Sequence, residues 1–221
     1  RGSVLMGAVR PIIDSTPTMN DAWILARSKV KYYGAYPSGF LKRARRQLVG
    51  DDPEKIIWHI PGGMAREYNG TKGGILLEGF GKMDKTIDLN PACKPDFEID
   101  VRDLTSHFRP VAFSEYELSI TGFRDSSKLE LIQIERPDAI IIDRPYTLKD
   151  ADHYPPGADK FPQLSKLIKD CLEIVKPGCF VGVIDYEWPQ LGKNYREVFL
   201  HPVLTGRGNK IRLFSGWEKL R

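Results

Sequence analysis

Short apolar runs alternate along the chain with longer amphipathic stretches, and most of the apolar runs end on polar residues. A short apolar run bounded by turn residues predicts a buried strand. We expect strands at residues 55–60, 85–90, 95–100, 138–143, 179–185 and 210–219. The sequence TGRGN precedes the last of these, so we expect that strand to be antiparallel to its neighbour.

Three segments predict helices. Residues 20–31 begin with Asn20 or Asp21 as a helix cap, and residues 37–48 place apolar side chains at helical spacing. The strongest pattern lies in residues 162–175, whose apolar face consists of Leu164, Leu167, Ile168, Cys171, Leu172 and Val175. Strands that alternate with helices predict an α/β fold. We expect a Rossmann-like, mostly parallel sheet with an antiparallel C-terminal strand and helices on both faces.

Residues 104–137 interrupt this alternation. They contain ELSITGF and KLELIQI, two runs of alternating polarity, which predict either a β-hairpin-like insertion or a helix with an extra strand. The insertion either contributes to a substrate groove or serves packing. We expect an N-terminal arm and helix over residues 1–31 and one domain over residues 32–221.

Composition narrows the class of protein. The chain has 221 residues, 41% of them hydrophobic, as in ordinary globular proteins. The sequence has no apolar run of the roughly 18 residues that cross a bilayer, and it has no signal-peptide core. Three scattered cysteines without a CxxC pair argue against a disulfide framework or a zinc site. We therefore expect a cytoplasmic protein without a membrane partner.

Net charge is +4, which permits an anionic partner without requiring one. Within residues 27–46, however, seven lysines and arginines occur with aromatic side chains between them and without a single acid. Such a segment suits phosphates and unstacked bases. The alternative is a solvated helix face beside ordinary core aromatics.

The polar strand ends predict a site. They are Pro61-Gly62-Gly63, Asp88, Asp100, Asp143 and Asp185. Ligands of open α/β sheets bind beyond the carboxyl ends of the strands, so these residues should converge.

Their chemistry suits a nucleoside. A glycine turn lets the backbone approach a ligand. Asp88 follows Gly63 by 25 residues and could accept hydrogen bonds from ribose hydroxyls, as the acid of dinucleotide folds does. Asp100 could accept from an exocyclic amine, and Val101 could flank a purine ring. Each residue alone also suits an ordinary turn, so the signal is their order.

Six segments in succession resemble a known family: YYGAYPSGFLKRARRQL, KIIWHIPGG, IDLNP, FEIDVRDL, DAIIIDRPY and CLEIVKPGCFVGVID. The family is that of class I S-adenosylmethionine-dependent methyltransferases. More narrowly, the chain is similar to the DNA methyltransferases that act on adenine N6 or cytosine N4, in the small form that phages and prophages carry. The resemblance covers roughly residues 32–220.

The resemblance implies S-adenosylmethionine as cofactor. The implied cofactor contacts are Tyr36, Pro37, Pro61, Gly62, Gly63, Asp88, Asn90, Asp100 and Val101. In the family a Tyr-Pro segment helps to close over the cofactor, the glycine turn lies against its methionine part, and the two acids bind its ribose and its adenine amine.

The family's catalytic tetrapeptide is Asp/Asn/Ser-Pro-Pro-Tyr/Phe/Trp, and the chain has Asp143-Arg144-Pro145-Tyr146 in its place. The lone pair of an exocyclic amine is delocalised into the base. A carboxylate and a backbone carbonyl that accept its two hydrogens make the nitrogen nucleophilic by position and electrostatics. Asp143 is the implied acceptor, Pro145 stiffens the loop, and Tyr146 stacks on a flipped base.

The expected partner is nucleic acid, DNA ahead of RNA. The candidate contacts are Lys31, Arg43, Arg46, Arg144, Tyr154 and Trp188. The chain has no separate recognition domain of the usual size. Target recognition would therefore come from residues 104–137, from a homo-oligomer or from a partner subunit, or it would be weak.

Three alternatives remain open. The chain could methylate RNA or a protein amide, because the same tetrapeptide serves those substrates. It could be an inactive cofactor-binding or nucleic-acid-binding homologue, since Arg144 replaces a proline and the glycine turn departs from the family pattern. A nicotinamide-dependent dehydrogenase is the weakest alternative, because GxGxxG is absent.

Overall fold

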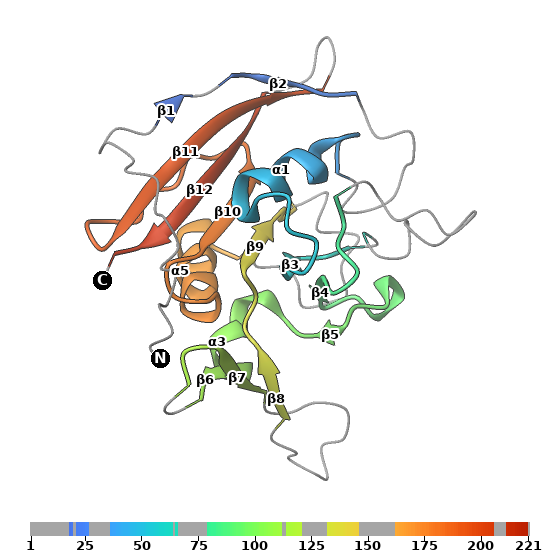
Figure 1. The fold of residues 1–221 in the computed structure, drawn as a ribbon, viewed down its shortest axis with the longest axis vertical. Helices are drawn as coiled ribbons and strands as arrows, with labels where there is room; N and C mark the ends of the chain where they lie inside the picture. The colour runs from blue at the N-terminus through green and yellow to red at the C-terminus, as the bar shows by residue number, and fades with distance from the viewer. Residues whose placement is uncertain are drawn as a thin grey trace, which may run out of the picture.

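The computed structural model describes most of the chain, namely residues 18–19, 21–26, 36–63, 65, 79–111, 114–120, 132–145, 162–205 and 211–220. A nine-stranded sheet forms its centre (Figure 1). Five neighbouring strands run parallel, namely β3 (Ile57–Ile60), β4 (Lys85–Asp88), β5 (Phe97–Glu98), β9 (Ala139–Ile142) and β10 (Phe180–Asp185).

The C-terminal part of the sheet contains β11 (Tyr195–Leu204) and β12 (Arg212–Lys219). Strand β12 is antiparallel to both β10 and β11, between which it lies. The mostly parallel sheet with an antiparallel C-terminal strand is therefore confirmed. Strand β11 was not expected from the sequence.

The order of the parallel strands is β5-β4-β3-β9-β10. The chain starts at β3, adds β4 and β5 on one side, and then returns to add β9 and β10 on the other side. This is the doubly wound order, and its switch point lies between β3 and β9. In open α/β sheets the switch point is where ligands bind, beyond the carboxyl ends of the strands.

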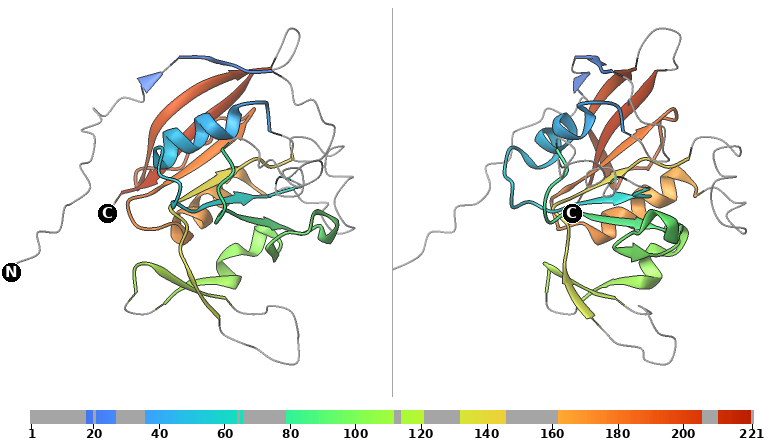
Figure 2. Two further views of the ribbon diagram at one scale, coloured as in Figure 1. Left: turned by 45° about the vertical axis from the view of Figure 1, so that its right-hand side comes forward. Right: turned by 90° about the vertical axis from the view of Figure 1, so that its right-hand side faces the viewer.

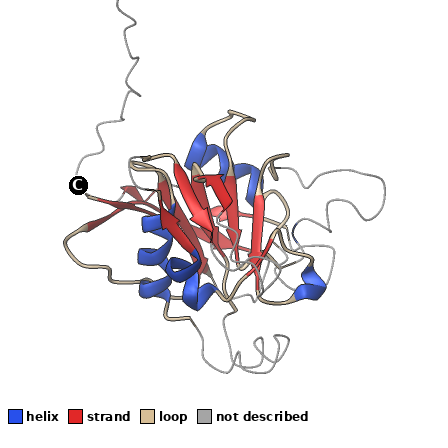
Figure 3. Cartoon of the chain, turned by 90° about the horizontal axis from the view of Figure 1, so that it is seen from below, coloured by secondary structure: helices blue, strands red, loops and turns tan. Residues whose placement is uncertain are grey.

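Helices cover both faces of the sheet (Figure 3). Side chains alternate across a strand, so Ala139 and Ile141 of β9 pack with α1 (Phe40–Val49), whereas Ile140 and Ile142 pack with α5 (Leu164–Ile174). Both helices bury the apolar faces that helical spacing predicts. Within the described ranges, no helix combines the length and hydropathy needed to cross a bilayer.

The interruption at residues 104–137 holds a second, smaller sheet beside a short helix (Figure 2). Its strands are β6 (Phe108–Pro110), β7 (Glu117–Ile120) and β8 (Ile132–Glu135), all antiparallel. The helix α3 (Leu104–His107) follows a 3-10 turn at Val101–Asp103, and another 3-10 turn spans Pro91–Cys93. The hairpin and the helix, which the sequence offered as alternatives, are thus both present.

The expected N-terminal helix over residues 20–31 is wrong for the described residues 21–26. Strand β2 (Trp23–Ile24) pairs in parallel with β11, as β1 (Thr18–Met19) does. The exposed fraction of Trp23 is 8% and that of Ile24 is 76%, which is the alternation of a strand. The apolar run WIL contacts the sheet edge instead of forming a helix face.

Candidate active site

The turns that follow neighbouring strands meet at the carboxyl edge of the main sheet. After β3, the backbone N–H of Gly62 donates to the carbonyl of Ile87 in β4, at 2.7 Å. After β9, the N–H of Asp143 donates to the carbonyl of Ile60 in β3, at 3.2 Å. The convergence that the polar strand ends predict is present at the switch point.

The glycine turn packs tightly against β4. A Cβ on Gly62 would lie 2.5 Å from the Cβ of Thr86, so no larger residue fits there without a shift of the chain. Gly63 has a φ of 49°, a conformation that side chains disfavour. Pro61 is buried and follows a cis peptide bond. The turn therefore has a packing reason for its glycines in addition to any approach of a ligand.

Asp88, at the end of β4, forms hydrogen bonds to the turns that follow β3, β4 and β5. Its carboxylate accepts the N–H of Gly63 at 2.8 Å and that of Asn90 at 2.9 Å, and its backbone carbonyl accepts the N–H of Ile99 after β5. The side chain is fully buried, and burial raises the pKa of Asp88 while these N–H donors oppose the rise. Contact between this carboxylate and a ligand hydroxyl would require the surrounding turns to open, because no part of Asp88 is exposed.

The turn after β5 carries the second carboxylate. The Asp100 carboxylate accepts the backbone N–H of Arg102, and both of its oxygens lie 2.9 Å from the Arg102 Nε. This ion pair lowers the pKa of Asp100. Val101 beside it is buried. The Asn90 side chain accepts the N–H of Ala92 and caps the 3-10 turn after β4. A ligand amine that reaches Asp100 would share its carboxylate with Arg102.

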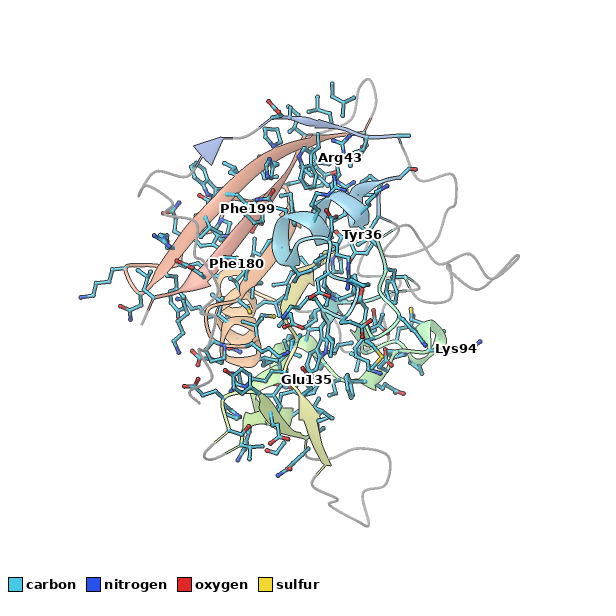
Figure 4. All side chains as sticks on the ribbon, viewed as in Figure 1. Tyr36, Arg43, Lys94, Glu135, Phe180 and Phe199 are labelled. Carbon is cyan, nitrogen blue, oxygen red and sulfur yellow. The ribbon has the colours of Figure 1, made fainter. Side chains whose placement is uncertain are left out.

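Tyr36 and Pro37 lie deeper than a cofactor contact suggests. Tyr36 is 3% exposed, its ring stacks on Phe40 at 5.5 Å, and its hydroxyl lies 3.2 Å from the Nδ1 of His59 in β3 (Figure 4). Pro37 is buried before α1. Contact between the Tyr36 ring and a cofactor would require this side chain to leave the core.

A buried carboxylate that was not expected from the sequence lies at the amino end of β4, at the sheet edge opposite to the site. Asp84, directly before β4, is fully buried and accepts hydrogen bonds from Arg45 of α1 and from the N–H groups of Ile57 and Gly81. Burial acts to raise its pKa, but the neighbouring His59 and these donors keep the pKa lowered. Asp84 thus joins α1, β3 and β4. In the sequence, its only signal is an acid directly before the strand KTID.

The segment after β9 begins with Asp143, which is half-buried, as is Pro145. Between them, Arg144 is buried and points toward the end of β10 rather than into solvent. Its Nε donates to the Asp185 carboxylate at 2.7 Å, and a second nitrogen lies 2.6 Å from the Glu187 carboxylate. A third contact joins it to the carbonyl of Pro162 before α5. A phosphate contact by Arg144 would require both ion pairs to open.

Asp185 organises the turn after β10. Besides Arg144, its carboxylate accepts the backbone N–H groups of Tyr186 and Glu187. Asp185 was expected at a strand end, without a role of its own in the site. The exposed fractions of Tyr186 and Trp188 in this turn are 42% and 53%, and the indole N–H of Trp188 donates to Glu197. Two aromatic rings are thus available beside the edge.

The basic residues predicted on α1 lie on its exposed side. The Arg43 guanidinium stands 5.9 Å from the centre of the Trp23 ring, and Arg46 pairs with Asp51 at 2.9 Å (Figure 4). Both contacts are at the surface and leave the helix face open to a polyanion. Lys31, Tyr146 and Tyr154 lie outside the described residues.

Solved structures of other proteins resemble this chain in part, among them the two that follow. No family model and no curated protein matches the chain. Among solved structures, TrmN from Thermus thermophilus is similar with 16% identity and a TM-score of 0.46 over 85% of this chain and 50% of that one. A candidate methyltransferase from Streptococcus mutans, solved in complex with SAH, has 14% identity and a TM-score of 0.41 over 85% of this chain and 99% of that one. This chain thus spans half of TrmN, and at these values neither likeness assigns an activity.

Proposed function

We propose that the chain binds S-adenosylmethionine and transfers its methyl group to an exocyclic amino group of a nucleic-acid base. Adenine N6 in DNA is the first expected acceptor and cytosine N4 the second. The observation that carries the proposal is that the glycine turn, Asp88, the Asp100 turn and the Asp143 segment follow neighbouring strands at one edge of the sheet, which includes the switch point.

The residues at this edge fit the cofactor in kind. Asp88 and Asp100 follow adjacent strands, β4 and β5, and supply acceptors for ribose hydroxyls and for an adenine amine. Gly62 and Gly63 place a backbone without side chains next to Asp88. When bound, S-adenosylmethionine supplies an electrophilic methyl group on a sulfonium. The rest of the proposed chemistry belongs to the chain.

Asp143 is the proposed acceptor for the target amine. It lies next to the end of β3, because its N–H donates to Ile60. A hydrogen bond from the amine to its carboxylate, with a second to a backbone carbonyl of the same segment, would localise the nitrogen lone pair. Holding that nitrogen in line with the methyl group then lowers the barrier by orientation.

The surface beside this edge supports a base as substrate. Tyr186 and Trp188 offer exposed rings, and an aromatic ring stacks on an unstacked base. Arg43 and Arg46 place positive charge on the exposed side of α1. Phosphates favour such a side electrostatically.

The experiment that tests the proposal uses S-adenosylmethionine labelled in its methyl group. Incubation with DNA, RNA and protein, followed by digestion, identifies the acceptor and the methylated atom. Label in N6-methyladenine or N4-methylcytosine of DNA supports the proposal. Label only in RNA or in protein moves the acceptor to one of the alternatives.

Replacement of Asp143 separates catalysis from binding. Asp143→Ala should lower the methyl-transfer rate by about 100-fold or more, because it removes the side-chain acceptor for the amine. Cofactor affinity, measured by calorimetry, should stay within about threefold. The matched control is Asp52→Ala, in the exposed turn between α1 and β3. Near wild-type transfer by Asp143→Ala would contradict the assigned role.

A further inference from the structure

A cavity of about 210 Å³ lies at the edge of the main sheet opposite to the candidate active site. Arg136 and Cys179, which precede β9 and β10, line it, together with Lys219 and Leu220 at the end of β12. Because β12 is antiparallel to β10, its C-terminal end lies at the amino ends of the parallel strands. Figure 4 labels Glu135 and Phe180, the sequence neighbours of Arg136 and Cys179, on this side of the molecule.

Arg136 is a buried cation with an incomplete set of partners. It is 7% exposed, and one terminal nitrogen donates to the carbonyls of Glu173 and Val175 at the end of α5, at 3.3 and 3.1 Å. Its Nε has no hydrogen-bond partner, and across the described ranges it forms no salt bridge. Buried guanidinium groups are normally paired, because an unpaired buried charge is costly.

The acids around the cavity are already matched by lysines. Lys219 pairs with Glu173 at 2.6 Å, and Lys176 pairs with both Glu135 and Asp138. Among the residues that line the cavity, Arg136, Lys176 and Lys219 are basic and only Glu173 is acidic. Glu173 and Glu115 act on the charge of Arg136 through space, but neither forms a salt bridge with it within the described ranges.

Helix and solvent effects offset only part of this charge. The carboxyl end of α5 carries a partial negative charge, which favours a cation at Glu173 and Val175. The Nε itself is shielded from solvent, so neither water nor a ligand in the cavity reaches it. An oxyanion at a terminal nitrogen of the guanidinium would accept a charge-assisted hydrogen bond and add the missing negative charge.

We propose that this cavity binds a small organic oxyanion, with its carboxylate or phosphate on Arg136 and its carbon skeleton against Leu172, Pro177 and Leu220. A volume of about 210 Å³ is below that of drug-sized pockets, so the ligand has few heavy atoms. The site is independent of the proposed methyl transfer, because it lies at the other edge of the sheet.

Titration calorimetry at constant ionic strength tests the site with three probes. These are sodium 3-methylbutanoate, inorganic phosphate and sodium chloride. Saturable binding of the carboxylate or of phosphate, without binding of chloride, is the expected result, and the tighter of the two identifies the ligand class. If neither 3-methylbutanoate nor phosphate shows saturable binding, the proposal is wrong and the cavity holds only water.

Two variants assign the binding to Arg136. Arg136→Gln should weaken the better probe by about tenfold or more, because the charge-assisted bonds are lost. Arg109→Gln, an exposed arginine on β6, is the matched control and should bind as wild type does. Equal affinity of wild type and Arg136→Gln would refute the site.

A chemical readout covers the case in which Arg136→Gln does not fold. Cys179 lines the cavity and is half-buried, whereas Cys93 and Cys171 are buried. In the wild-type protein, a saturating concentration of the bound probe should slow alkylation of Cys179 by iodoacetamide by about threefold or more, as expected when ligand excludes the reagent. An unchanged rate at saturation would place the bound probe elsewhere and overturn the proposal.

Discussion

At the end of β9, Arg144 is held between carboxylates that belong to the turn after β10. The side chains of Arg144 and Asp185 are 8% and 3% exposed. The ion pair therefore joins the proposed catalytic segment to β10 in a place where water screens it little. The same arginine also binds the carbonyl of Pro162, so it joins both strands to the start of α5.

Loss of the Arg144 guanidinium should destabilise the fold. Arg144→Met leaves the buried Asp185 carboxylate with backbone donors only. We expect the free energy of unfolding to fall by about 3 kcal/mol, at the low end for a broken buried ion pair. Urea denaturation measures it. The double variant Arg144→Met/Asp185→Leu should recover part of the loss, and a single variant as stable as wild type would mean that the pair contributes little.

At the scale of elements, the N-terminal strand β2 and the long strand β11 enclose a histidine. His201 of β11 is 3% exposed and stacks on Trp23 of β2 at 4.6 Å, with Phe214 behind. Neither ring nitrogen has a hydrogen-bond partner among the described residues. Burial lowers the pKa of His201, and nearby Asp21 opposes the shift.

The lowered pKa predicts a loss of stability in acid. As the pH falls below about 6.5, His201 becomes protonated in the unfolded chain, whereas in the folded chain it stays neutral to a lower pH. The free energy of unfolding therefore decreases as the pH falls toward the folded pKa of His201. The slope that His201 contributes is positive and has an upper limit of about 1.4 kcal/mol per pH unit. Urea denaturation between pH 7 and pH 5 should show this slope in wild type and a flatter line in His201→Phe.

The histidine in α3 provides the control for this measurement. His107→Gln lies outside the cluster and should keep the wild-type slope. Parallel pH dependences of wild type and His201→Phe would show that His201 remains unprotonated in both states or ionises equally in both.

At the scale of the whole molecule, a ligand at the switch point should stabilise the entire sheet, because β3, β4, β5 and β9 all end there. S-adenosylmethionine at about 100 times its Kd should add about 2.7 kcal/mol. For a chain of this size that raises the Tm by roughly 5–10 °C. Differential scanning calorimetry with increasing ligand measures the shift.

Two comparisons make the thermal shift specific. Asp100→Asn should show a smaller shift at the same ligand concentration, since the proposed acceptor for the adenine amine is weakened, whereas Asp52→Asn should match wild type. NAD should give no shift. A shift with NAD but none with S-adenosylmethionine would favour a dehydrogenase and contradict the proposed cofactor.

Local sequence patterns alone predict many of the strands and helices of this molecule. The sequence predicts β3, β9 and β10 from their apolar runs, and α1 and α5 from the helical spacing of their apolar residues. These predictions need only the local spacing of apolar and polar residues. The convergence of Gly62, Asp88 and Asp143 also follows from the sequence, since parallel strands bring their carboxyl ends to one edge.

Tertiary packing decided the rest. Trp23 and Ile24 form a strand because the edge of β11 is there to pair with them, and no local sequence pattern shows which sheet edge is open. Arg144 pairs with Asp185 41 positions away, Asp84 accepts from Ile57 27 positions away, and Arg136 donates to Val175 39 positions away. Only the folded chain brings such side chains within hydrogen-bonding distance and removes the water that would otherwise balance their charges.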